Sequence, residues 1–137
     1  MLYTLKRLNL NDIMRNPILF GSSVCMTLST IVCSVALRYK VNKFLLFLYL
    51  FGDFTSMWNH GTHSMIARRV DRTVMAVGAC IDLYYITDLR RLLFLMASIS
   101  CYFISKTCKT EEMRISWHTN AHLWVSILHN DQLANTE

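Results

Sequence analysis

The stretch from Asn16 to Leu37, NPILFGSSVCMTLSTIVCSVAL, is a run of 22 residues without a charged side chain. A helix of this length rises about 33 Å, enough to cross the hydrocarbon core of a bilayer, which is about 30 Å thick. Pro17 suits the first turn of such a helix because the N–H that proline lacks has no helical partner there. The stretch therefore predicts a membrane-spanning helix over 17–37.

Further apolar segments follow, each shorter than the first, and the charges fall almost wholly between them. A solvated helix face would instead carry charges at every third or fourth position. The chain is 53% apolar with one proline, unlike an ordinary soluble domain. We therefore expect an all-α fold, a polytopic membrane helix bundle of about five short transmembrane helices in a single domain over 1–137. The expected helices are 17–37, 43–60, 71–87, 91–106 and 112–129. A soluble helical bundle with one membrane anchor is the alternative.

The fourteen Lys and Arg residues give the chain a net charge of +5. They are spread over all the connections between predicted helices and form no stripe with interleaved aromatics, so nucleic-acid binding is not indicated. If the N-terminus is cytosolic, nine of them lie on the cytosolic side and five on the other, which favours that orientation. We expect an integral, multi-pass membrane protein whose partners are membrane lipids.

Polar residues recur at one end of the predicted bundle. Ser56 and His60 are four residues apart, as are His118 and His122, so each pair shares a helix face. The end of the second helix and the starts of the third and fifth lie at the same membrane face, and Asp71 stands at the start of the third. We therefore expect these side chains to converge. Ionisable groups near lipid are costly unless paired or ligated, which makes them candidates for function.

Three neutral imidazoles with an open fourth position are typical of a catalytic zinc site, in which the metal lowers the pKa of a bound water. His60, His118 and His122 are the candidate ligands. Asp71 is the candidate to accept a hydrogen bond or a proton from that water, and Ser56 to hold an oxyanion or to support a ligand. Two alternatives remain: the histidines are hydrogen-bonded structural residues, or His63 replaces His60 as a ligand.

The ordered set of Ser56, His60, Asp71, His118 and His122 resembles the signature of the CREST superfamily of membrane hydrolases. That group includes the alkaline ceramidases, the progestin and adipoQ receptors and the myomaker-like proteins. The eleven-residue step from His60 to Asp71 is most similar to the alkaline-ceramidase arrangement. The resemblance implies zinc on the three histidines, Asp71 beside the water and Ser56 next to it, in a hydrolase that cleaves a lipid amide or ester.

The chain also departs from that family. The family has seven helices, whereas this sequence has room for about five, and the acidic N-terminal calcium-binding stretch of the ceramidases is absent. The loss of two helices preserves the direction of the last one but removes part of any lipid-binding wall. The alternative function is therefore a non-catalytic membrane structural or interaction protein, such as a membrane-remodelling factor or a degenerate relative, that keeps a structural metal site. Homo-oligomerisation, which would complete a pocket, is left open.

Three other polar residues lie in the apolar segments. Asp53 shares the face of Ser56 and His60, and either tunes a ligand or pairs with a basic or hydroxyl group of another helix. Asp82 lies three turns beyond Asp71 on the same face, and we expect it to be buried against protein. We expect His129, near the far end of the last predicted helix, to be interfacial.

Overall fold

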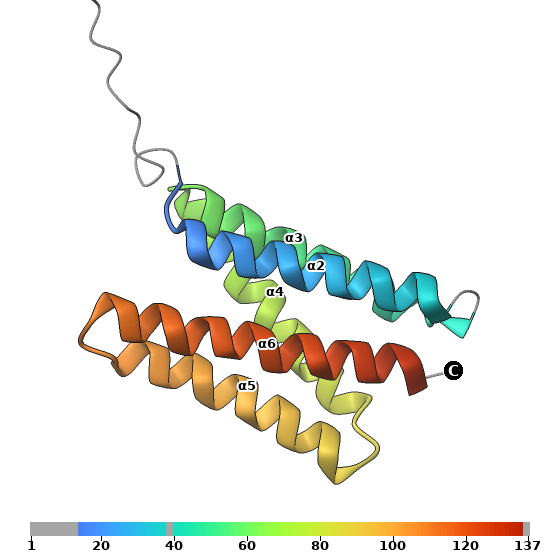
Figure 1. Cartoon of the computed structure of the whole chain (residues 1–137). Coiled ribbons are helices and arrows are strands. Elements are labelled where there is room, and N and C mark those ends of the chain that lie inside the picture. The colour runs from blue at the N-terminus through green and yellow to red at the C-terminus, as the bar shows by residue number, and fades with distance from the viewer. Residues whose placement is uncertain (1–13, 38–39, 136–137) are drawn as a thin grey trace, which may run out of the picture.

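The computed structural model describes residues 14–37 and 40–135, and within them the chain is all-α, with no strand. Labelled as in Figure 1, the helices are α2 (Pro17–Leu37), α3 (Lys43–Gly61), α4 (Met65–Tyr84), α5 (Leu89–Thr107) and α6 (Glu111–Asn135). All five helices predicted from the sequence are present. This confirms the all-α helical bundle.

Three of the predicted boundaries are wrong, one of them the end of α4, which lies at Tyr84 and not at 87. Helix α4 begins at Met65 and not at 71, because the Ser64 side chain accepts a hydrogen bond from the Ala67 N–H at 3.2 Å and caps the helix there. Asp71 therefore lies in the second turn. Helix α6 continues to Asn135 and not to 129, because Gln132 and Leu133 are fully buried in its last turns.

Polar side chains also cap the other helices. The Asn16 Oδ1 accepts from the Leu19 N–H at 3.0 Å ahead of Pro17, Asn42 caps α3 and Asp88 caps α5. Each of these caps satisfies N–H groups that have no partner inside the helix. The short connections between the helices are therefore fixed locally.

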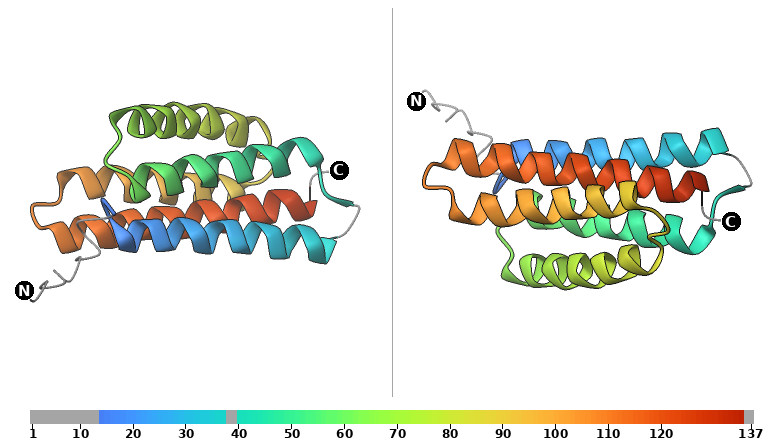
Figure 2. Two further views of the ribbon diagram at one scale, coloured as in Figure 1. Left: turned by 90° about the horizontal axis from the view of Figure 1, so that it is seen from above. Right: turned by 90° about the horizontal axis from the view of Figure 1, so that it is seen from below.

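The helices lie side by side in a curved layer. Helix α2 packs between α3 and α6, and α5 packs along α6. Helix α4 lies on the outside, as Figure 2 shows; it packs along α3 and makes few contacts with α5. The weak α4–α5 contact leaves a groove, described below.

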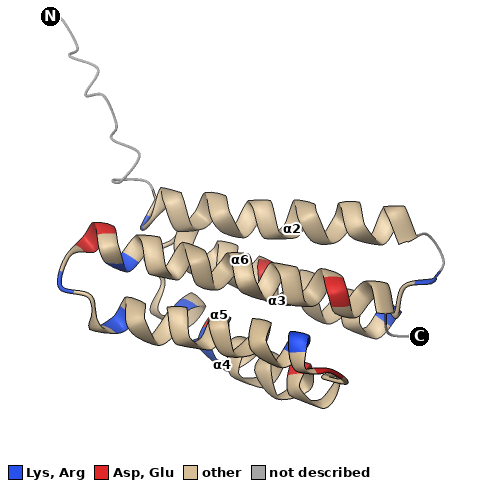
Figure 3. Cartoon of the chain, turned by 60° about the horizontal axis from the view of Figure 1, so that its bottom comes forward, with Lys and Arg blue, Asp and Glu red and all other residues tan. Residues whose placement is uncertain are grey.

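The described residues have a polar interior and an apolar exterior. Sixteen buried side chains are polar or charged and ten are apolar, whereas many large apolar side chains are exposed. On α3 the exposed aromatics follow one face at steps of three and four residues, at Phe44, Phe47, Phe51, Phe54 and Trp58. Most Lys and Arg residues lie near the two ends of the bundle (Figure 3). Among the described helices, α2 alone is long and apolar enough to be a candidate membrane span.

Buried polar side chains form a network at the end of the bundle where α5 starts and α6 ends. Asp82 is buried as expected, and its carboxylate accepts a hydrogen bond from the Tyr49 hydroxyl at 3.2 Å. His129 belongs to the same network: its Nε2 lies 3.2 Å from Asp82 Oδ2, and its ring stacks on Tyr49. Because α6 runs on to Asn135, His129 lies farther from the end of the helix than the sequence indicated.

Candidate metal centre

His60, His118 and His122 converge at the other end of the bundle. The ring nitrogens that they offer lie within 4.8 Å of one another, and all three side chains are buried. The ring centroids of each pair are 4.9 to 5.5 Å apart. The convergence expected from the two four-residue spacings is therefore present.

Three helices position these histidines. His60 ends α3, and its carbonyl accepts a hydrogen bond from the Asn16 N–H at 3.0 Å, which ties the start of α2 to the end of α3. His118 and His122 lie one turn apart on α6; His122 contacts Ser22 of α2, and His118 packs against Tyr102 of α5. Close approach of α2 to α3 depends on Gly61, where a Cβ would lie 3.0 Å from the Phe20 ring.

A serine of α2 sets the tautomer of His122. The Ser22 hydroxyl donates to the Leu19 carbonyl at 2.8 Å and lies 2.7 Å from His122 Nδ1. A hydroxyl has one proton, so a Ser22 that donates to Leu19 accepts from the His122 Nδ1–H, and Nε2 then keeps its lone pair. His122 Nε2 is buried without a hydrogen-bond partner among the described residues. This is how a second residue prepares an imidazole to bind a metal.

Asp71 lines one cavity together with His60 and His118, and it ends a hydrogen-bonded chain. Arg15 donates to the Asn59 Oδ1 at 2.6 Å, and Asn59 donates from Nδ2 to the Asp71 Oδ2 at 2.7 Å. The other carboxylate oxygen, Oδ1, is buried and has no partner in the described part of the chain. Asp71 is thus held in place through one oxygen and keeps the second available.

The Ser56 hydroxyl is hydrogen-bonded to a serine of α2. Ser56 Oγ lies 2.9 Å from Ser23 Oγ, and either hydroxyl can be the donor. Ser56 is buried and lines one cavity together with His122. Its position near the site agrees with the prediction, but its hydrogen bond links α3 to α2.

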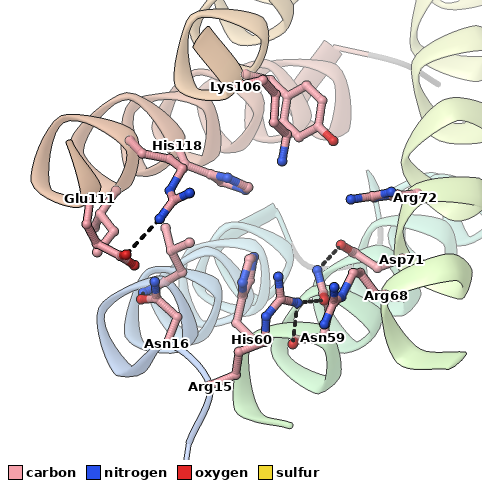
Figure 4. A pocket seen from close by; sticks show the side chains of 14 residues that line it. Arg15, Asn16, Asn59, His60, Arg68, Asp71, Arg72, Lys106, Glu111 and His118 are labelled. Carbon is pink, nitrogen blue, oxygen red and sulfur yellow. Dashed lines mark hydrogen bonds and ion pairs between the residues drawn. The ribbon is translucent and has the colours of Figure 1, made fainter. Parts of the chain in front are cut away.

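A polar cavity of about 330 Å³ opens onto His60 and His118. Figure 4 shows these two rings and Asp71 directed into it, with cations around its rim. We call it the cationic pocket; its basic lining residues are Arg15, Arg68, Arg72, Lys106 and Arg114. Arg15 stands outside the helices, and its pKa is lowered, mainly by burial and then by the charges of Arg68 and Arg72. The pocket therefore has a positive potential.

An apolar cavity of about 340 Å³ lies on the other side of His122. We call it the apolar groove; it runs between α4 and the other helices, and its wall includes Leu48, Gly52, Val74, Gly78, Leu95 and Phe103. Arg72 and Tyr102 line both cavities. The histidine cluster thus stands where a charged cavity and an apolar one meet.

The donor set fits a zinc ion. Imidazole nitrogens are ligands that zinc prefers, and buried nitrogens without partners are costly unless they bind something. His60 Nε2 and His122 Nε2 are two such atoms among the described residues. His63 is exposed in the connection after α3 and is not part of the cluster, so the geometry gives no support to its replacing His60.

The remaining acids of the apolar segments lie away from the cluster. Asp53 is buried, and the Thr30 hydroxyl donates to it at a long 3.5 Å, which matches the expected hydroxyl pairing. Asp82 belongs to the network with Tyr49 and His129. The sequence indicated neither Ser22, Asn59 nor Arg15 as part of the site, because their partners are far away along the chain.

Comparisons with protein-family models, with curated proteins and with solved structures find no match to this chain.

Proposed function

We propose that this protein is a zinc-dependent integral-membrane hydrolase that cleaves an amide or ester bond of a lipid. The observation that carries the proposal is the buried cluster of His60, His118 and His122, which has two nitrogens without partners in the described residues. An Asp71 oxygen, likewise without a partner there, belongs to a cavity that His60 and His118 also line. A purely structural three-histidine site has no need of a carboxylate held ready beside it.

The three histidines would hold the metal. Zinc bound there supplies a Lewis acid and a water of lowered pKa. Ser22 fixes the His122 tautomer, and Asn59 holds Asp71 so that Oδ1 can accept a proton. The Arg15 guanidinium, bonded to Asn59, keeps that amide oriented with its NH2 group toward Asp71. Each group therefore binds, orients or accepts a proton.

We extend the proposal to a multi-pass membrane bundle with the site on the cytosolic side. The polar interior and the apolar exterior support it, since a lipid-facing surface is apolar and polar groups then face the bundle interior. The helices have 19 to 25 residues, or about 28 to 38 Å, which matches a bilayer core of about 30 Å. By sequence order alone, nine of the fourteen Lys and Arg residues belong to the side of the site, which favours the cytosol.

We also propose kinship with the CREST superfamily. The support is the ordered set of five residues, of which the three histidines and Asp71 lie together at one end of the bundle. Five helices in place of seven mean that the lipid-binding wall is built differently here. We therefore derive the substrate from this chain's own cavities below.

Metal content of the detergent-purified protein tests the proposal first. We expect about one zinc per chain, lost in His118→Ala/His122→Ala and kept in His63→Ala, which removes an exposed histidine outside the cluster. Mass spectrometry of metals on folded protein provides the measurement. If wild-type protein from cells grown with zinc is folded but contains no zinc, the proposal is wrong and the histidines are structural residues.

Turnover separates the enzyme from the alternative of a structural metal site. Asp71→Asn should keep zinc and lose hydrolysis of acyl lipids by about 10²-fold or more, because the general base is gone. If instead Asp71→Asn leaves the biological function intact while metal removal unfolds the protein, the metal is structural and the chain is a membrane interaction protein.

A further inference from the structure

Two cavities of opposite character meet at the histidine cluster, and together they describe a ligand. The cationic pocket borders His60 and His118, and the apolar groove borders His122. Both volumes, about 330 and 340 Å³, fall within the range of small-molecule sites. A molecule that fills both must have a charged part and an apolar part, with the junction at the metal centre.

The charged part is an anion. Among the described residues, no carboxylate forms an ion pair with Arg68, Arg72 or Lys106. Arg114 pairs with Glu111 at 2.7 Å, and the Asp71 oxygen that has a partner is bonded to Asn59. The Nε of Arg68 is buried without a partner in the described chain. A guanidinium fork with free donors matches a phosphate.

The apolar part is a single extended chain. The groove runs from His122 to His129 along α6, a length of about 10 Å at 1.5 Å per residue. Its α4 wall is built from small or slender residues, among them Gly78, where an added Cβ would meet nothing within 4 Å. Asp82 and His129 close the far end, and they are bonded to each other.

We propose that the substrate is an acyl lipid with a phosphate-bearing headgroup, held with the phosphate in the cationic pocket and one acyl chain in the apolar groove. This places the acyl bond of the lipid between the two cavities, at the histidines. The inference rests on the proposed hydrolase for its chemistry, whereas the binding it predicts does not depend on turnover.

Two matched lipids test the headgroup. Oleoyl lysophosphatidic acid and monooleoylglycerol carry the same acyl ester, and only the first carries a phosphate. In neutral-detergent micelles, the full-length protein should bind the phosphate lipid at least tenfold more tightly, as expected for one or more charge-assisted hydrogen bonds. Arg68→Gln/Arg72→Gln should remove this preference. Arg69→Gln/Lys109→Gln, an equal loss of two charges at exposed residues outside the pocket, should keep it.

Two glycines test the groove. Gly78→Leu places a side chain in the groove and also replaces a poor helix former, so the protein should fold and bind both lipids about tenfold or more weakly. Gly21→Leu is the matched control, since Gly21 also has open space around it but lines neither cavity. Glycerol 3-phosphate, which lacks the chain, should bind weakly and be indifferent to Gly78→Leu.

The outcomes separate this inference from the proposed function. Equal affinity for the two lipids, or no effect of Gly78→Leu, overturns the inference even if zinc and hydrolysis of neutral lipids are found. Affinity of glycerol 3-phosphate equal to that of the phosphate lipid overturns it as well. If zinc-loaded protein binds the phosphate lipid selectively but never hydrolyses it, the proposed binding site is upheld and the proposed hydrolase function is overturned.

Discussion

At the scale of single residues, the hydroxyl of Ser22 decides whether His122 can act as a ligand. It bonds the His122 Nδ1 and so leaves Nε2 with its lone pair. We expect Ser22→Ala to weaken zinc binding by about 10- to 100-fold, the usual effect of losing such a partner. Chelator competition on purified protein measures this affinity.

The neighbouring serine provides the control. Ser23 bonds the same Leu19 carbonyl, but its second partner is Ser56 and not a histidine. Ser23→Ala should therefore leave zinc affinity unchanged. Equal losses in both variants would mean that the effect comes from α2 packing and not from the His122 tautomer.

The histidines of the site were predictable from the sequence, and their supporting residues were not. A four-residue step on a helix fixes which side chains share a face, so His118 and His122 are paired by local geometry alone. Arg15 and Asn59 are 44 residues apart, and Ser22 and His122 are 100 apart. Their contacts depend on which helices become neighbours, and no local pattern specifies that.

At the scale of helices, a buried ion pair joins the start of α5 to the end of α6. Arg91 Nε lies 2.7 Å from Asp131 Oδ2, and the Arg91 side chain is 4% exposed. We expect Arg91→Met to lower the free energy of unfolding by about 3 kcal/mol, because it leaves Asp131 partly buried without its inner partner. Unfolding of the protein in detergent, followed by circular dichroism, measures the change.

Arg90 is a matched control for this pair. Its Nη2 also lies 2.7 Å from Asp131, but its side chain is 61% exposed, so Arg90→Met should cost about 0.5 kcal/mol or less. The double variant Arg91→Met/Asp131→Leu should recover much of the loss, since no buried charge is left unpaired. A cost for Arg90→Met as large as for Arg91→Met would contradict the assignment.

The helix boundaries show where sequence patterns stop being informative. The N-terminal boundaries of α2 and α3 follow from Pro17 and Lys43, where apolar runs begin. The start of α4 was missed because Arg68, Arg69 and Arg72 looked like a polar connection, although they lie on the first two turns and some of them line a pocket. The end of α6 was missed because Gln132 is polar and yet buried.

At the scale of the whole molecule, the apolar exterior predicts how the protein sits in a bilayer. Cys25 and Cys80 are exposed on the outer faces of α2 and α4, and Cys108 ends α5 beside the α5–α6 connection. For the proposed multi-pass bundle, we expect a membrane-impermeant maleimide to modify Cys108 from one side of a sealed vesicle and to leave Cys80 unmodified, because lipid covers α4 in that architecture. Mass spectrometry of peptides provides the measurement.

The same experiment discriminates between the two architectures that the sequence leaves open. A soluble bundle anchored by α2 alone would protect Cys25 and allow modification of Cys80. Val77→Cys, one turn deeper on the exposed face of α4, repeats the test farther from the helix end. The number and the type of the helices were predictable from the spacing of charges in the sequence. Which helices pack against each other was not predictable, since nothing in the sequence placed α4 on the outside.

Because α4 lies on the outside of the bundle, the residues of the site are divided between two groups of helices. The proposed ligands and Ser22 come from α2, α3 and α6, and α2 packs closely against the other two. Asp71, Arg68 and Arg72 come instead from α4, which is held chiefly by α3. Substitutions along α4 can therefore alter reactivity while the histidines stay in place. If the protein is the proposed zinc hydrolase, a descendant can lose catalysis through changes in α4 and still retain the metal, so a relative that carries zinc need not carry the activity.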